Sequence, residues 1–141
     1  MFYKKMSRFF SSLLIVLLCC SIFASAAYQR ASSRIALAIA SLEKESNGDL
    51  SITCCIEATK VMDEIGVSSI RIDRSNGSGW IRECAITEND FPRLSVTGLS
   101  SHDIQVPYSP QYSNVRYRAV VAFYAKDSEG KSTKNVTTNS I

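Results

Sequence analysis

Apolar side chains recur at every second position in two stretches of this chain, residues 50–58 and 117–125. A period of two places successive side chains on opposite faces of a β-strand, so each stretch is predicted to be a strand with one buried face. The other face of the second stretch also carries Val120 and Ala122, which predicts a central position in a sheet. The alternating positions are Leu50, Ile52, Cys54, Ile56 and Ala58, followed by Tyr117, Ala119, Val121, Phe123 and Ala125.

Shorter runs of the same kind occupy the rest of the chain. Residues 68–74 and 80–87 flank Asn76-Gly77, a dipeptide that favours the left-handed backbone of a tight hairpin turn. Residues 102–108 are predicted to form an edge strand, because Pro107 cannot donate to a ladder of backbone hydrogen bonds. Residues 132–141 are polar and follow a turn at 127–130, so we expect an exposed terminal strand there.

The first segment after the predicted signal peptide fits two patterns. Residues 34–43 alternate as a strand does, yet they also fit one face of an alanine-rich helix. We favour the strand, because a first strand can cover an otherwise open sheet edge. Residues 62–66 and 90–94 are expected to form short helical turns.

The order of these elements predicts the fold class. Seven candidate strands within residues 33–141, joined by local turns and without a strand–helix–strand pattern, favour a single all-β domain. We expect a two-sheet antiparallel β-sandwich of the immunoglobulin or fibronectin type III kind.

Residues 117–123, Tyr-Arg-Ala-Val-Val-Ala-Phe, resemble the sixth strand of a fibronectin type III domain. The resemblance implies that the hydroxyl of Tyr117 fastens a loop, for which residues 110–114 are suitably placed. A second set of motifs comprises residues 58–59, 62–66 and 69–72, Trp80 after a Gly/Ser turn, and the strand 117–125. With these motifs the chain resembles, over residues 33–139, small secreted proteins of Gram-positive bacteria that have no established function. The motifs behind this second resemblance are structural, so it implies a compartment and a fold but no active site.

The first residues have the three-part layout of a secretory signal peptide. Lys4, Lys5 and Arg8 precede the apolar run 9–24, and small residues follow at 24–26. An uncleaved membrane anchor is the alternative, but Ser11, Ser12 and Ser21 dilute the run. We therefore expect residues 1–26 to be removed and the mature protein to be extracellular and free of the membrane.

Removal of this segment changes the charge of the protein. Three of the 16 lysines and arginines lie in it, and the remaining 13 balance the 13 acidic residues, all of which lie downstream. The mature chain is formally neutral, so its net charge does not favour nucleic acid or an anionic membrane as a partner.

Three cysteines remain after cleavage, and an odd number leaves at least one thiol unpaired within the chain. Alternation places Cys54 with Ile52 and Ile56, and Cys84 with Trp80 and Ile86, so either a buried Cys54–Cys84 disulfide or two buried free thiols is possible. Cys55 would point outward as a free thiol, or would link two chains into a dimer. Adjacent cysteines face opposite sides of a strand, and the Cys-x-x-Cys spacing typical of zinc sites is missing, so no metal or cofactor is expected.

No motif in the chain predicts catalysis. The one histidine, His102, could serve a small secreted hydrolase together with a serine or cysteine, but no Gly-x-Ser-x-Gly motif accompanies it. We favour a non-enzymatic extracellular binding module for carbohydrate, cell wall or protein. Its candidate binding residues are Tyr108, Tyr112 and Tyr124, which could form an exposed aromatic strip, and Trp80, which could stack on a sugar ring although it fits the core better.

Overall fold

The computed structural model describes residues 34–141, and within them it contains eight strands and no helix. The predicted signal peptide, residues 1–26, lies outside the described residues. The strands are β1 (Ile35–Lys44), β2 (Leu50–Met62), β3 (Glu64–Ser75), β4 (Trp80–Ile86), β5 (Ser95–Val96), β6 (Leu99–Tyr108), β7 (Tyr117–Asp127) and β8 (Gly130–Thr137).

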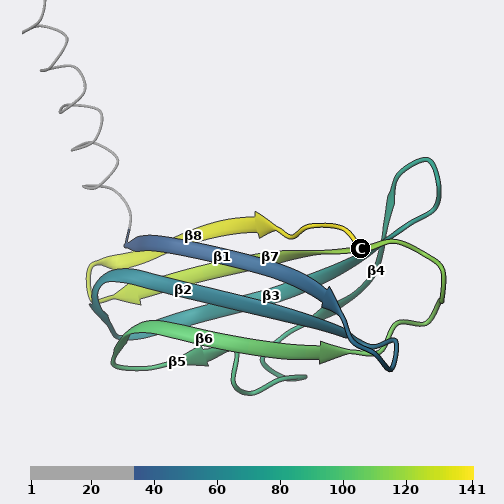
Figure 1. The fold of residues 1–141 in the computed structure, drawn as a ribbon. Coiled ribbons are helices and arrows are strands. Elements are labelled where there is room, and N and C mark those ends of the chain that lie inside the picture. The colour runs from purple at the N-terminus through teal and green to yellow at the C-terminus, as the bar shows by residue number, and fades with distance from the viewer. Residues whose placement is uncertain (1–33) are drawn as a thin grey trace, which may run out of the picture. The chain divides into compact units, whose positions relative to one another are not determined.

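These strands form two antiparallel sheets (Figure 1). The first has the order β1-β2-β6, and the second has the order β4-β3-β7-β8, with the two-residue β5 paired to β3. The predicted two-sheet architecture is therefore confirmed, with one short strand more than the sequence pattern indicated.

The core lies between the sheets and is built from the alternating positions of the long strands. Leu50, Ile52, Cys54 and Ile56 from β2 are buried, as are the five predicted positions of β7 from Tyr117 to Ala125. Ile70 and Ile72 of β3 join the same cluster from the second sheet. Burial of these apolar side chains is the main favourable contribution to folding.

The positions of single strands within the sheets also follow the sequence pattern. β7 lies between β3 and β8, so it is an interior strand, and β6, which contains Pro107, lies at the edge of its sheet. β8 forms the outer edge of the other sheet. Residues 35–44 form a strand, which confirms the strand alternative for the first segment.

Two polar side chains build the hairpin turns. Asn76 Oδ1 accepts hydrogen bonds from the backbone nitrogens of Ser78 and Gly79 at 3.1 and 2.7 Å, and Gly77 has φ 89°. In the turn between β7 and β8, Asp127 Oδ1 accepts from the backbone nitrogens of Glu129 and Gly130 at 3.0 and 3.1 Å. Each side-chain oxygen thus accepts hydrogen bonds from backbone N–H groups that a tight turn leaves without a backbone partner.

The helical turn predicted at 62–66 is wrong, and residues 90–94 contain a hydrogen-bonded turn but no helix. Met62 ends β2 and Glu64 begins β3, where Ile65 pairs with Ala125 and is fully buried, so packing of the sheet determines this segment. Residues 88–93 form hydrogen-bonded turns that lead to the buried side chain of Leu94.

A side-chain amide closes the free edge of β1. Asn139 Oδ1 accepts from the backbone nitrogen of Leu42 at 2.9 Å, and Asn139 Nδ2 donates to the backbone oxygen of Leu42 at 2.9 Å. This pair joins the edge of the first sheet to the segment that follows β8.

The part of the chain that the structure describes, residues 34–141, contains no helix that could span a membrane.

Candidate functional site

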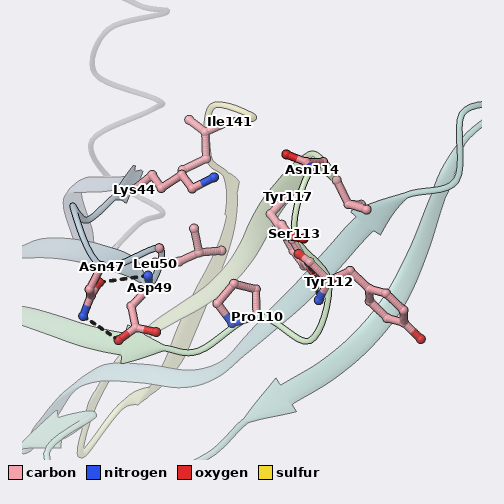
Figure 2. Close-up of a pocket in the computed structure, with 12 residues that line it drawn as sticks. Lys44, Asn47, Asp49, Leu50, Pro110, Tyr112, Ser113, Asn114, Tyr117 and Ile141 are labelled. Carbon is pink, nitrogen blue, oxygen red and sulfur yellow. Dashed lines mark hydrogen bonds between the residues drawn. The ribbon is translucent and has the colours of Figure 1, made fainter.

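A pocket of about 280 Å³ lies at one end of the two sheets (Figure 2). It is bounded by the turn between β1 and β2, by the loop between β6 and β7, and by Ile141. The lining residues are Lys44, residues 47–50, Pro110, residues 112–115, Tyr117 and Ile141.

The turn between β1 and β2 forms one wall of the pocket. Asn47 Nδ2 donates to Asp49 Oδ2 at 3.0 Å, and Asn47 Oδ1 accepts from the backbone nitrogen of Asp49 at 3.0 Å (Figure 2). Gly48, between them, has φ 92°, a conformation that glycine adopts at little cost. The turn is therefore held by its own side chains.

The loop between β6 and β7 forms the opposite wall, and Tyr117 holds it. The Tyr117 hydroxyl donates to the backbone oxygen of Tyr112 and accepts from its backbone nitrogen, both at 3.3 Å. Two residues further, Asn114 has φ 60°, a left-handed conformation that asparagine tolerates better than most residues. The loop thus keeps a defined shape beside the pocket.

The pocket has an apolar floor and a polar rim. Leu50 and Tyr117 are almost fully buried, and Val115 and Ile141 pack against the core, so the base is apolar. Lys44 belongs to the rim, as do the amide, carboxylate and hydroxyl groups of Asn47, Asp49, Ser113 and Asn114. An apolar surface with a few polar groups around it is typical of sites for small organic ligands.

Behind this wall lies a buried carboxylate, Glu83. Its Oε1 accepts hydrogen bonds from the Tyr108 hydroxyl and from the backbone nitrogen of Gln111, and its Oε2 lies 3.6 Å from Arg74 Nε. Burial, reinforced by the hydrogen bond to Glu83, raises the pKa of Tyr108, so its hydroxyl stays protonated and donates. The cluster fixes the start of the β6–β7 loop.

Tyr108, Tyr112 and Tyr124 do not form one exposed strip, so that expectation is wrong. Tyr108 points between the sheets, where its ring centroid lies 6.5 Å from that of Tyr117. Tyr124 is only 5% exposed; its hydroxyl bonds Glu64, and Lys131 Nζ lies 4.3 Å from its ring centroid. Tyr112 lines the pocket, but its ring points away from Lys44 and Asn47 (Figure 2).

Trp80 is half-buried and lies outside the core, so its expected core position is wrong. Ile72 pairs with Cys84, but Asp73 pairs with Arg82, which leaves Glu83 as an extra residue in β4. Such a bulge reverses which face the preceding residues occupy. Trp80 therefore lies on the outer face, where the Arg118 guanidinium carbon is 4.5 Å from its ring centroid.

The three cysteines of the described residues are free thiols. The Cys54–Cys84 disulfide is thus not formed. The alternative of two buried free thiols holds for Cys54, which is in the core, but Cys84, on the edge strand of the second sheet, is only half-buried. Burial raises the pKa of Cys54 to about 12, and burial also raises the pKa values of Cys55 and Cys84. All three are therefore poor nucleophiles near neutral pH.

His102 lies on β6, and its Nε2 bonds the backbone oxygen of Arg93 at 2.9 Å. Because a carbonyl oxygen accepts, this ring nitrogen carries the proton. No hydrogen bond joins His102 to a serine or cysteine within residues 34–141. In the same residues, no group of three or more histidine, cysteine or acidic side chains is arranged to hold a metal ion.

Comparisons with known proteins do not assign this chain to a family. No family model matches it, and no curated protein matches it. Among solved structures, it is similar to the solution structure of a protein described as a candidate late embryogenesis abundant (LEA) protein, with 15% identity and a TM-score of 0.47. The similarity covers 90% of this chain and 86% of that one.

Proposed function

We propose that this protein is an exported, non-enzymatic binding module that takes part of a carbohydrate into the pocket at the end of its sheets. The observation behind the proposal is the pocket itself, with Leu50 and Tyr117 at its base and polar side chains such as Asn47 and Asn114 around it. A sugar ring has a matching character, because its C–H face is apolar and its edge carries hydroxyl groups. Polar residues placed around an apolar base orient such a ligand.

We further propose that the sandwich is of the immunoglobulin or fibronectin type III kind. Two observations support this assignment: the strand order β1-β2-β6 against β4-β3-β7-β8, and the bond from Tyr117, the first residue of β7, to the loop before it. A tyrosine in this place, bonded to backbone a few residues upstream, is typical of these sandwiches. Their loops commonly carry binding sites, which agrees with the position of the pocket.

The proposed export depends on the pattern of residues 1–26. Cells that express the complete coding sequence should release a protein whose amino terminus lies near residue 27, as mass spectrometry of the culture medium can determine. Retention of the full-length chain in the membrane would contradict export.

The protonation of the three cysteine thiols and the hydrogen bond of His102 support a non-enzymatic role. The raised pKa values of Cys54, Cys55 and Cys84 disfavour thiolate formation, and His102 bonds a backbone oxygen. The hydrolase alternative, His102 with a serine or cysteine, therefore has no geometric support.

Cys55 could link two copies of the chain. Cys55 pairs with Ile39 on β1 and with Asp103 on β6, and it lies on the face of the first sheet that is turned away from the core. Non-reducing electrophoresis of the exported protein and of a Cys55→Ser variant tests this link. A dimer band that persists in the variant would exclude it.

The binding proposal is tested on a panel of printed oligosaccharides and on isolated peptidoglycan. The variant Lys44→Met with Asn114→Gly removes two rim groups, and glycine retains the positive φ of residue 114. We expect this variant to lose at least about tenfold in affinity for whichever glycan the protein binds, because several hydrogen bonds to ligand are removed.

Lys134→Met is the matched control, because Lys134 is exposed on β8 and does not line the pocket. The control should bind as the unmodified protein does. Failure of the unmodified protein to bind any glycan or peptidoglycan would remove the proposal, as would equal binding by the pocket variant.

A further inference from the structure

The outer face of the sheet β4-β3-β7-β8 carries arginines from neighbouring strands. Asp73 on β3 lies between Arg82 on β4 and Arg118 on β7 in the strand register. Residues directly opposite each other in antiparallel strands project to the same side, so these three share one face. Arg71 is two positions along β3 and therefore shares it too.

Arg116 extends this surface beyond the start of β7. Its backbone oxygen accepts from the nitrogen of Ser75, which continues the pairing of β3 with β7, and its exposed side chain bonds Ser140 Oγ. Arg116 is two positions before Arg118, which places both on the same face. We refer to Arg71, Arg82, Arg116 and Arg118 as the arginine face.

The arginine face concentrates charge on a chain that is otherwise balanced. Four arginines and the single carboxylate of Asp73 leave three positive charges on it, whereas residues 27–141 carry 13 positive and 13 negative side chains. Neutrality of the mature chain therefore conceals one strongly basic surface. Such a surface attracts anions over a distance of about 10 Å at moderate ionic strength.

Two of the arginines are held in fixed orientations. Asp73, whose side chain is 4% exposed, accepts from Arg71 Nε at 2.9 Å, from Arg71 Nη2 at 3.1 Å and from Arg118 Nε at 3.2 Å. The Arg118 guanidinium also lies over the Trp80 ring, with its central carbon 4.5 Å from the ring centroid. The remaining N–H groups of Arg71 and Arg118 donate no hydrogen bond to residues 34–141, so they are available to a ligand.

We propose that the arginine face binds an anionic polysaccharide that carries carboxylate groups. The guanidinium fork matches a carboxylate with two parallel hydrogen bonds, which is the geometry Arg71 already shows toward Asp73. Arg82 and Arg118 lie two strands apart, a separation of about 10 Å, so the face meets several charged groups of one extended chain.

Two other polyanions fit this surface less well. Single-stranded nucleic acid is bound through several aromatic side chains that stack on successive bases, and the arginine face has one, Trp80, which Arg118 already covers. Binding to a membrane surface is strengthened by apolar side chains that enter the lipid. Within residues 34–141 the large exposed apolar side chains lie elsewhere: Leu37, Ile39, Val61, Ile81, Leu99 and Tyr112.

The arginine face adjoins the pocket but uses different side chains. Arg116 follows the pocket residue Val115, and its partner Ser140 precedes the pocket residue Ile141. A polysaccharide on the arginine face could therefore continue toward the pocket. Because no arginine of the face lines the pocket, the two surfaces can be tested separately.

The test measures binding of soluble polygalacturonate, with neutral dextran as the uncharged probe, to the protein recovered from cells that express the complete coding sequence. The variant Arg82→Gln with Arg116→Gln removes two charges from exposed positions of the face. We expect its affinity for polygalacturonate to fall on the order of tenfold at low salt. Affinity of the unmodified protein should fall as salt rises.

The matched control is Arg93→Gln with Lys134→Gln, which removes two exposed charges outside the face. It should bind polygalacturonate within about twofold of the unmodified protein. An equal loss in the control would mean attraction by net charge alone and would overturn the proposal. Absence of polygalacturonate binding, or tighter binding to single-stranded DNA or to phosphatidylglycerol vesicles, would overturn it as well.

Discussion

The Tyr117 hydroxyl lies 3.3 Å from both the backbone nitrogen and the backbone oxygen of Tyr112, so one side chain satisfies both polar groups of a loop residue. The same loop forms a wall of the pocket, which makes Tyr117 important for both folding and ligand binding.

Replacement of Tyr117 by phenylalanine should therefore lower the free energy of unfolding by about 1 kcal/mol, since the apolar ring stays and only the hydroxyl is lost. Urea denaturation followed by fluorescence measures the change. Tyr112→Phe is the control, because Tyr112 is 47% exposed and its hydroxyl makes no hydrogen bond to residues 34–141. Equal stabilities of the two variants would contradict the role of the Tyr117 hydroxyl.

Gly66 has no room for a side chain. A Cβ atom there would lie 2.2 Å from the backbone oxygen of Leu94 and 2.6 Å from the Cα of Ser95. Since backbone cannot rotate away as a side chain can, Gly66→Ala should displace β5 and lower stability by about 2 to 3 kcal/mol. The midpoint of thermal unfolding should fall on the order of 10 °C.

Gly79→Ala is the matched control for this substitution. No atom outside its neighbours lies closer than 4.0 Å to a Cβ built at Gly79, and its φ is ordinary. Its unfolding midpoint should change little, and a loss as large as that of Gly66→Ala would contradict the steric explanation.

Asp127 should contribute to the pH dependence of stability. Lys60 Nζ at 2.9 Å and Arg34 Nε at 2.8 Å hold the pKa of its carboxyl well below the ordinary value of 3.8. A carboxylate whose pKa is lower in the folded state adds stability above that ordinary value, and this contribution is lost as the pH falls further. Asp127→Asn should thus be less stable than the unmodified protein at pH 7, with the difference shrinking in acid.

Unfolding midpoints in urea between neutral pH and strong acid measure this difference. Asp63→Asn is the control, because Asp63 forms no ion pair within residues 34–141. A constant difference between the unmodified protein and Asp127→Asn across the whole pH range would show that Asp127 does not act through its ionisation.

Cys55 and Cys54 should differ in their reaction with iodoacetamide. Cys54 has no exposed surface and a pKa raised to about 12, whereas Cys55 is half-buried on the outer face. Alkylation of the native protein should therefore modify Cys55 first, and Cys54 should react only after unfolding. Peptide mass spectrometry gives the order, and early modification of Cys54 in the native protein would contradict its burial.

The alternation of apolar and polar residues predicted the strands, because a strand with one buried face needs an apolar side chain at every second position. It located the buried face of β2 and the central place of β7, and Pro107 indicated the edge position of β6. It misplaced Trp80, since the bulge at Glu83 follows from how β4 pairs with β3 and has no local sequence signal.

The pocket and the arginine face could not be predicted, because both depend on distant segments. Asn47 lies in the turn between β1 and β2, but nothing local in the sequence brings it near Asn114. Likewise Arg82 and Arg118 are 36 positions apart in the sequence, and only the register of three strands places them on one face. The net charge of the chain gave no sign of the arginine face, because it sums the charges of all surfaces.

The amide of Asn139 has a consequence for solubility. An uncovered strand edge offers unpaired backbone groups to other chains and can act as a template for aggregation. By occupying both backbone groups of Leu42, near the end of β1, Asn139 prevents a foreign strand from pairing at this position of the edge. A proteolytic cut that removes residues 139–141 would leave the backbone groups of Leu42 open to pairing with another chain.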